Sequence, residues 1–200
     1  MNDEYKALAE KQLSTEEIYN GVILHVIRDK VLLPNGDTSG RELIRHVGAV
    51  CVIPVTDDGK VVVERQFRYP VGRVLTEIPA GKLDSKQVDH ELAARRELRE
   101  ETGYVADELI DLGIFYPAPA YSDEAITMYL ARGLHPGDQD LDDDEYLNVE
   151  LVPLEDLARQ VLAGEIPDVK TQAAVMRAYF MLRTESSISG VCLEESSLID

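Results

Sequence analysis

The longest apolar run in the chain lies at residues 47–55, and shorter runs of the same kind follow it. This run reads Val-Gly-Ala-Val-Cys-Val-Ile-Pro-Val, which is typical of a strand buried on both faces. The sequence Asp57-Asp-Gly59 predicts a turn from this strand into a second apolar stretch at residues 60–68. The same pattern predicts further strands at residues 109–115, 125–131 and 146–152.

The first 45 residues carry a weaker pattern. Residues 1–14 form a polar lead-in with room for a short helical turn, and residues 18–31 are rich in β-branched side chains. The dipeptide Asn35-Gly36 favours a hairpin turn, after which residues 41–45 return as a strand. An antiparallel β meander is therefore expected before the main domain.

Helical periodicity replaces the strand pattern near the C-terminus, at residues 154–162 and 170–183. Gly164 and Pro167 separate the two expected helices. The order of strands and helices predicts an α+β fold, in which a mixed sheet is flanked by helices. Residues 184–200 are rich in Ser and Glu, and we expect them to be disordered.

Three parts of the chain follow from these patterns: an N-terminal β arm at 1–45, a main domain at 46–183 and a tail at 184–200. A chain of 200 residues with 44% hydrophobic content suits a single globular domain with a substantial core. No repeat of one segment by another is visible along it.

Charge and cysteine content narrow the class of protein. The formal net charge of −18 argues against nucleic acids and anionic membranes as partners. No apolar run approaches the length of a membrane span, and the first six residues lack the pattern of a secretory signal. Cys51 and Cys192 lie far apart and form no metal-binding spacing. A reduced, cytoplasmic protein is the expectation.

An acidic helix is expected between Asp89, which can cap its start, and Gly103, which suits a left-handed stop. Glu97 and Glu101 lie one turn apart on this helix, with Glu100 beside them. Carboxylates that lie within one helical turn of one another repel, and a bound divalent cation removes this repulsion. Ligands that are all oxygen favour Mg²⁺ or Mn²⁺ over zinc. The alternative is a solvated acidic helix face, which is what most charge runs are.

The full spacing around this helix closely resembles the Nudix box. Gly81 is followed by Arg96-Glu97-Leu98-x-Glu100-Glu101-x-Gly103-Tyr104, which matches the second half of that motif. The first half departs from it: Gln87 stands where the motif has glutamate, and the interval to Arg96 is one residue longer. The resemblance implies a Nudix fold, an αβα sandwich with a mixed sheet.

Motifs outside the box resemble the ADP-ribose pyrophosphatases, a nucleoside-diphosphate-sugar branch of the family, from about residue 15 to residue 183. These motifs are Gln66-Phe-Arg-Tyr-Pro70, Glu77-Ile-Pro-Ala-Gly-Lys-Leu83, Tyr116-Pro-Ala-Pro119, Ser122-Asp-Glu124 and Asp142-Asp-Asp-Glu145. The resemblance implies metal-dependent hydrolysis of ADP-ribose to AMP and ribose 5-phosphate. It also implies a homodimer built through the N-terminal meander. Hydrolysis of GDP-mannose or another nucleotide sugar, and a Nudix-fold module that binds ADP-ribose without cutting it, are the alternatives.

The resemblance also assigns the expected metal site. Glu97 and Glu101 would be the main ligands of Mg²⁺, with Mn²⁺ as a substitute. Glu100 would be a further ligand, direct or through a water molecule, and also a catalytic residue. The Ala80 carbonyl would be a backbone ligand. Arg96, one turn from Glu100, would orient the acids.

The resemblance implies substrate contacts from three regions. Arg68 resembles an arginine that binds the diphosphate, a role that its planar donor fork suits, and the family places a substrate-contacting acid at Glu77. The alternatives are an ordinary surface arginine at 68 and an acid that caps a turn at 77. Ser122 and Glu124 would form a substrate wall, although they could equally shape a turn. The resemblance further implies that Arg41 and Glu42 reach the nucleoside end, while the simpler reading is an ion pair across a hairpin.

The resemblance also implies that the general base lies in the acidic loop at residues 141–146 rather than on the box helix. Glu145 is the first choice, because it is the only glutamate of this cluster and has the longer reach, and Asp143 is the second. The alternative is a solvated acidic loop, which composition alone favours. Closure of the loop over a bound diphosphate would bring one carboxylate near the attacking water.

Overall fold

A computed structural model describes residues 3–195, and they form a mixed α+β fold, which confirms the predicted class. Two short 3-10 helices are labelled η1 (Asp3–Leu8) and η2 (Tyr69–Val71). The α-helices are α1 (His90–Thr102), α2 (Leu154–Leu162) and α3 (Val169–Glu195). The strands are β1 (Lys11–Asn20), β2 (His25–Leu32), β3 (Thr38–Arg45), β4 (Ala49–Pro54), β5 (Lys60–Arg68), β6 (Arg73–Glu77), β7 (Ala80–Lys82), β8 (Val105–Phe115), β9 (Ile126–His135) and β10 (Leu147–Pro153).

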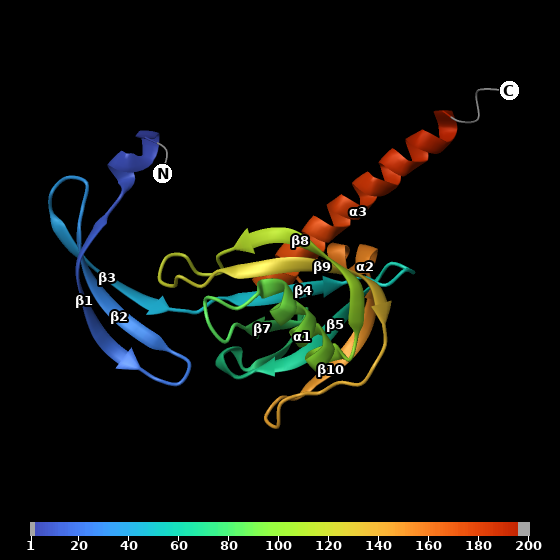
Figure 1. The fold of residues 1–200 in the computed structure, drawn as a ribbon, viewed down its shortest axis with the longest axis horizontal. Coiled ribbons are helices and arrows are strands. Elements are labelled where there is room, and N and C mark those ends of the chain that lie inside the picture. The colour runs from blue at the N-terminus through green and yellow to red at the C-terminus, as the bar shows by residue number, and fades with distance from the viewer. Residues whose placement is uncertain (1–2, 196–200) are drawn as a thin grey trace.

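Three sheets arrange these strands. The first has the order β1-β2-β3 and the second β10-β5-β6, and both are antiparallel. The third has the order β7-β4-β9-β8 and is mixed, because β4 runs parallel to β9 and antiparallel to β7. Figure 1 shows the second and third sheets together in the body of the molecule, with the first sheet standing apart at one side.

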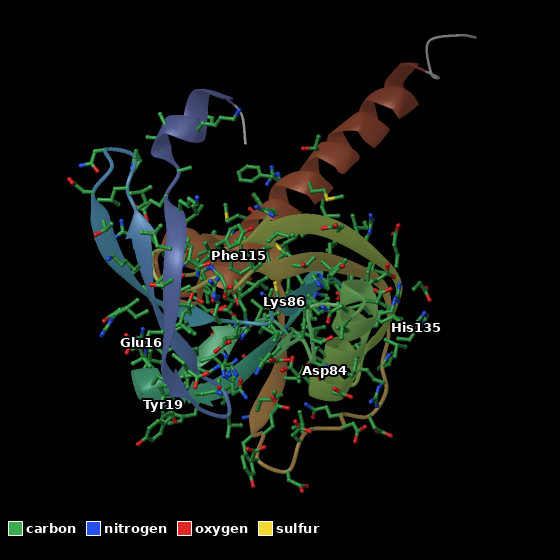
Figure 2. All side chains as sticks on the ribbon, turned by 60° about the vertical axis from the view of Figure 1, so that its left-hand side comes forward. Glu16, Tyr19, Asp84, Lys86, Phe115 and His135 are labelled. Carbon is green, nitrogen blue, oxygen red and sulfur yellow. The ribbon has the colours of Figure 1, made fainter. Side chains whose placement is uncertain are left out.

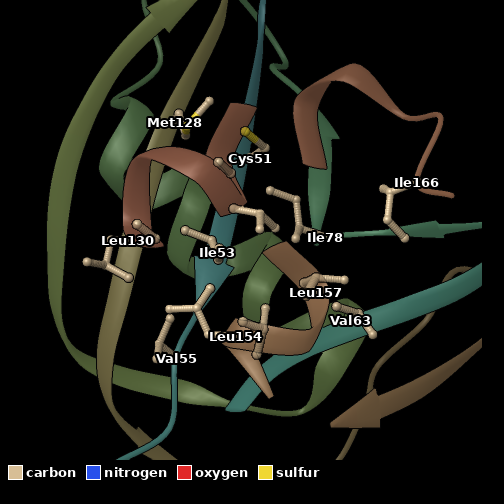
Figure 3. Packing of buried hydrophobic residues seen from close by; sticks show 14 of the residues in the cluster. Cys51, Ile53, Val55, Val63, Ile78, Met128, Leu130, Leu154, Leu157 and Ile166 are labelled. Atoms are coloured by element: carbon tan, nitrogen blue, oxygen red, sulfur yellow. The ribbon is translucent and has the colours of Figure 1, made fainter. Parts of the chain in front are cut away.

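Strand β4 is the centre of the core, as its apolar sequence predicts. All six of its residues are buried, and they alternate between two hydrophobic clusters. Cys51 and Ile53 face the cluster closed by α2 and α3, which Figure 3 shows together with Ile78 and Ile166. Val50 and Val52 face the other cluster, where α1 packs. The box helix is therefore fixed against the best-buried strand of the domain.

The N-terminal arm has one strand more than the sequence pattern indicates. Strand β1 is an added edge strand, and its ten residues are all exposed. Because no face of it is buried, it lacks the period-two alternation by which strands are recognised. The expected β-rich stretch at 18–31 is instead broken by a turn at residues 21–24, from which β2 begins.

Helix α3 continues to Glu195 and crosses the first part of the segment expected to be disordered. In Figure 1 its C-terminal half points away from the body of the molecule. A Ser- and Glu-rich composition indicates that little apolar surface can be buried, but it does not prevent the helical hydrogen bonds of one long helix. Residues 196–200 of that segment lie outside the described residues. Among the helices described, none is long and apolar enough to cross a membrane.

Candidate active site

Helix α1 begins and ends where its sequence predicts. The Asp89 carboxylate accepts the N–H groups of Glu91 at 2.9 Å and Leu92 at 3.2 Å, which caps the first turn. Gly103 ends the helix with a φ of 78° and donates its N–H to Arg99 O. Leu98 is completely buried in the cluster under β4. These contacts fix the rotation of the helix and with it the direction of its glutamates.

The box glutamates lie at different depths. Glu101 is 5% exposed, and its Oε2 accepts the N–H of Ala80 at 2.8 Å. Glu97 is partly buried and accepts from Arg96 Nη2 at 2.8 Å. Glu100 lies nearer the surface, where its Oε2 is 3.6 Å from Arg96 Nε. Glu101 is thus held by the backbone, whereas the two outer acids, Glu97 and Glu100, contact Arg96.

Arg96 is itself anchored by the loop before the helix. Its Nη1 donates to Asp84 at 2.8 Å, and Figure 2 shows Asp84 beside the ribbon of α1. Gln87, which occupies the place of the first motif glutamate, is exposed. A cavity of about 440 Å³ opens here, and it is lined by Lys82, Asp84, Arg96, Glu97, Glu100 and Asp142.

Gly81 lies directly under the Glu97 carboxylate. A Cβ atom at this position would come within 2.0 Å of Glu97 Cδ and 2.1 Å of its Oε2. The backbone of β7 can approach the box helix this closely because residue 81 has no side chain. The glycine that opens the motif therefore makes room for a carboxylate of the site.

Glu64 is a fourth glutamate of the site, and the sequence analysis missed it. It ends the apolar run Val61-Val-Val in β5, is 2% exposed and has one oxygen, Oε1, without a hydrogen-bond partner. Buried polar atoms are nearly always paired, so an orphaned carboxylate oxygen needs a ligand to explain it. A single charged residue in an otherwise apolar strand was the available signal.

Burial and mutual repulsion keep these carboxylates from ionising easily. The pKa of Glu101 is raised to about 10, first by burial and then by the charge of Glu64. Burial also raises the pKa of Glu64 to about 8, and that of Glu97 moves in the same direction. Charge on Glu145 adds to the rise at all three, which places it within electrostatic reach of them.

The donor set suits a hard divalent cation, because every candidate ligand is an oxygen. As they stand, no three acidic, histidine or cysteine side chains of the described residues enclose one point closely enough to hold an ion. The fit therefore depends on the unpaired oxygen of Glu64 and on the crowding of Glu64, Glu97 and Glu101. A cation among them would remove both the repulsion and the orphaned oxygen.

Arg68, which we expected at the substrate diphosphate, and Glu77, which we expected to contact the substrate, form a pair. Arg68 donates to Glu77 through Nε at 2.7 Å and Nη2 at 2.8 Å. Glu77 is only 2% exposed and also binds Lys170 of α3. Burial alone would raise the pKa of Glu77, but Arg68 and Lys170 lower it below its ordinary value. Glu77, for which we expected a substrate contact, instead has both oxygens bonded to these two cations.

The acidic loop places its two candidate bases differently. Glu145 is half-buried, and its Oε1 lies 3.5 Å from Gln66 Nε2 on β5. Asp143 is exposed, and so are its neighbours Asp142 and Asp144. Of the two candidates, Glu145 is the one whose charge reaches Glu64, Glu97 and Glu101.

Ser122 and Glu124 bond to each other at the end of their loop. Asp123, which lies between them, joins the loop to the rest of the protein. Ser122 Oγ accepts the N–H of Glu124 at 3.2 Å. Asp123 accepts the His46 N–H at 2.7 Å and Arg45 Nη1 at 3.1 Å. These bonds tie the loop to the junction between the N-terminal arm and β4.

Arg41 and Glu42 remain within the N-terminal arm in this single chain. Arg41 pairs with Glu10, and Glu42 accepts Arg28 Nη2 at 2.8 Å across β2 and β3. Neither bonds to the box helix or to Arg68 among the contacts of the described residues.

A mixed α+β fold with clustered carboxylates beside an open cavity is an arrangement that suits a metal-dependent hydrolase. The chain belongs to the Nudix family, because residues 45–174 match the NUDIX domain. Members of this family generally need a divalent metal.

Relatives and solved structures agree with the family. The chain is 42% identical to an ADP-ribose pyrophosphatase of Bacillus subtilis, over 85% of this chain and 92% of that protein. It is 40% identical to a methanol dehydrogenase activator of Bacillus methanolicus, with the same coverage of 85% and 92%. A crystal structure of an ADP compounds hydrolase superposes with a TM-score of 0.78 over 88% of this chain and 95% of that chain. At 22% sequence identity, that structure supports the fold alone.

Replacing Gly81 with alanine should displace Glu97 without unfolding the domain. The new methyl would occupy the place of the Glu97 carboxylate, which lies at the far end of a flexible side chain and can rotate away. We expect the affinity of Gly81→Ala for a divalent cation, measured by calorimetry, to fall about tenfold or more, because one ligand would no longer be correctly oriented. Gly40→Ala is the matched control, because its Cβ would meet no atom within 4 Å. Unchanged affinity in Gly81→Ala would contradict the close approach.

Glu64 should make the metal-free protein less stable as pH rises. Its pKa is raised from 4.5 to about 8, so the folded state holds a proton that the unfolded state has lost between these values. Its contribution to stability is complete below pH 4.5 and is lost as pH rises through about 8.

In EDTA, the melting temperature of Glu64→Gln should therefore fall less between pH 5 and 9 than that of the wild type, because glutamine has no proton to lose. Thermal melts in buffers at pH 5 and pH 9 measure this difference. Glu108→Gln, at an exposed glutamate, is the control, and its melting temperature should change with pH as that of the wild type does. Parallel curves for Glu64→Gln and the wild type would show that Glu64 is not the buried acid responsible.

Proposed function

We propose that this protein hydrolyses the diphosphate of ADP-ribose with Mg²⁺, for which Mn²⁺ can substitute. One water molecule is added across the diphosphate, and the products are AMP and ribose 5-phosphate. The observation that carries the proposal is the convergence of the buried Glu64 and Glu101 with the partly buried Glu97, within electrostatic reach of Glu145 and with Arg68 fixed nearby. The name of the 42%-identical Bacillus subtilis protein supports ADP-ribose as the substrate.

Glu97, Glu101 and Glu64 would hold the cation, with Glu100 and the Ala80 carbonyl as further ligands. Bound there, the cation supplies a lowered pKa for the attacking water and neutralises charge on the diphosphate. The rest of the chemistry falls to the chain's own residues. Arg68 binds a diphosphate oxygen through the part of its guanidinium that Glu77 leaves free. Glu145 takes the proton from the water.

A cytoplasmic setting fits this proposal, because Cys51 is a buried free thiol and the acidic composition disfavours binding to nucleic acid. Neither Arg68 nor the box acids distinguish one base or sugar from another, so GDP-mannose is the second substrate to test. A module that binds ADP-ribose without cutting it is disfavoured, since Glu64, Glu97 and Glu101 are all present and close together.

Activity should require the cation and Glu101. Phosphatase-coupled phosphate release from ADP-ribose and GDP-mannose, with Mg²⁺, Mn²⁺ or EDTA, tests the proposal directly. We expect turnover of ADP-ribose with either ion and none in EDTA. Glu101→Gln should lower kcat by about a thousandfold, or about 4 kcal/mol of barrier, while the protein stays folded. Binding of ADP-ribose without phosphate release in any metal would identify a binding module instead.

Substitutions of Glu145 and of Asp143 should have different effects on kcat. As the base, Glu145 should lose about 10²–10⁴-fold in kcat on substitution by glutamine, with little change in substrate affinity. Asp143→Asn should stay close to the wild type, because Asp143 is exposed and Glu145 is the acid near the buried glutamates. If both variants turn over normally, the water is activated without the loop.

We also propose a homodimer through the N-terminal arm. Residues Leu13, Ile18, Tyr19, Val22, Ile23 and Leu24 all expose apolar side chains there. Tyr19, which Figure 2 labels on β1, is 58% exposed. A second arm would bury this surface and support three strands that stand apart from the main core. Light scattering should give twice the mass of one chain at micromolar concentration; a fully active monomer would exclude the dimer.

A further inference from the structure

The first turn of α3 carries a buried lysine that the proposed chemistry does not use. Lys170 is 9% exposed, and it is the one buried lysine or arginine among the residues whose burial the structure describes. Its Nζ binds Glu77 Oε2 and lies 3.1 Å from Asp168 Oδ2. Burying a long ammonium side chain is unfavourable unless its partners compensate for the lost hydration.

The position of Lys170 on its helix adds to this cost. Helix α3 begins at Val169, so the ammonium lies in the first turn, where the helix dipole favours negative charge. Asp168 offsets part of this effect, because its Oδ2 accepts the N–H of Thr171 at 2.9 Å as a cap. A lysine at this end of a helix is better explained by the carboxylate it reaches than by the helix itself.

That carboxylate belongs to Glu77, the partner of Arg68. Glu77 Oε1 binds Arg68 Nε, and its Oε2 is shared between Arg68 Nη2 and Lys170. A buried carboxylate with two cations stays ionised and has one fixed orientation, so it holds the planar guanidinium of Arg68 in a fixed plane. The side chain of Arg68 remains 41% exposed and can present its remaining donors to a ligand.

A second bond from the same turn fixes the backbone next to Glu77. Thr171 Oγ1 accepts the Ile78 N–H at 3.0 Å and donates to Asp168 Oδ2 at 2.6 Å. Two residues after Ile78, the N–H of Ala80 binds Glu101. The start of α3 therefore holds the segment between Arg68's partner and the deepest box glutamate.

We propose that Lys170 is a positioning residue for the substrate diphosphate, acting through Glu77 to hold Arg68. Lys170 itself does not touch the substrate. The inference rests on the proposed function for what Arg68 binds, but the network of Lys170, Glu77 and Arg68 exists without any substrate. The alternative is a purely structural ion pair that fastens α3 to β6.

Kinetics separate these two roles. Lys170→Met keeps the length of the side chain and removes its charge, and it should raise the KM for ADP-ribose about tenfold with a smaller change in kcat. Lys170→Arg should recover most of the loss. In an Arg68→Ala background, Lys170→Met should change KM less than about twofold, because its effect passes through Arg68. Lys60→Met, at a half-buried lysine paired with Asp58, is the control for removing a lysine charge.

An equal loss of affinity with and without Arg68, or wild-type KM in Lys170→Met, would overturn the proposal. Unfolding in EDTA gives a measurement that needs no substrate. Lys170→Met and Glu77→Gln should be non-additive, with the double variant more stable than the sum of the single effects, since it leaves no unpaired buried charge. Additive effects would remove the Lys170–Glu77 coupling on which the proposal stands.

Two further results keep the test decisive. If Lys170→Met does not fold, the neutral pair Lys170→Met/Glu77→Gln replaces it and should show the same weakened affinity, while Lys170→Arg stays near the wild type. If the wild type splits no ADP-ribose, the proposed function fails, and the unfolding cycle still shows whether Lys170 holds Glu77.

Discussion

Two of the buried carboxylates, Glu64 and Glu101, have no cationic side chain bonded to them among the described residues, in a protein that already carries a net charge of −18, and the site is organised by that constraint. Glu64 is 2% exposed and Glu101 is 5% exposed. An ionised carboxylate in such a place costs several kcal/mol unless it is paired, protonated or bound to a cation. Apolar residues of similar volume would satisfy the fold at least as well. The depth of these two acids therefore favours the cation site that we propose for them.

The basic residues near the site are placed so that these two acids stay free. Arg96 bonds to Glu97 and to Asp84, and both Arg68 and Lys170 bond to Glu77. Each of these three cations fixes an acid at the edge of the cluster. Among the contacts of the described residues, the carboxylates of the deep pair, Glu64 and Glu101, receive only the Ala80 N–H, which Glu101 accepts. A divalent cation is then the strongest partner left for them, and it would meet a site already held in shape.

The parts of the fold that could be predicted from sequence are those with strong local signals. Strand β4 is apolar at nearly every position, and α1 has a cap, a glycine stop and the complete second half of the box. Strand β1 was missed because none of its residues is buried, so no alternation marks it. Where sequence reasoning failed, the cause was the absence of a local periodic signal.

Within the site, the missing knowledge was of long-range contacts. The box acids could be found from their spacing, but the burial of Glu77 depends on Lys170, which follows it by 93 residues. Glu64 lies in a strand whose apolar pattern is satisfied without it, so its place within electrostatic reach of Glu101 follows only from long-range packing. Lys170 cannot be assigned as the partner of Glu77 without knowing that α3 begins beside the end of β6.

The departure in the first half of the box also has a physical explanation. The loop before α1 is one residue longer than the motif, and Gln87 is exposed. Yet Arg96 still receives a carboxylate from this loop, because Asp84 reaches its Nη1 at 2.8 Å. The contacts of Glu97 with Arg96, and of Glu101 with Ala80, do not involve position 87. What the helix needs from the loop is an anion against Arg96, and an acid at residue 84 provides it. The absent glutamate is therefore no argument for a binding module over an enzyme.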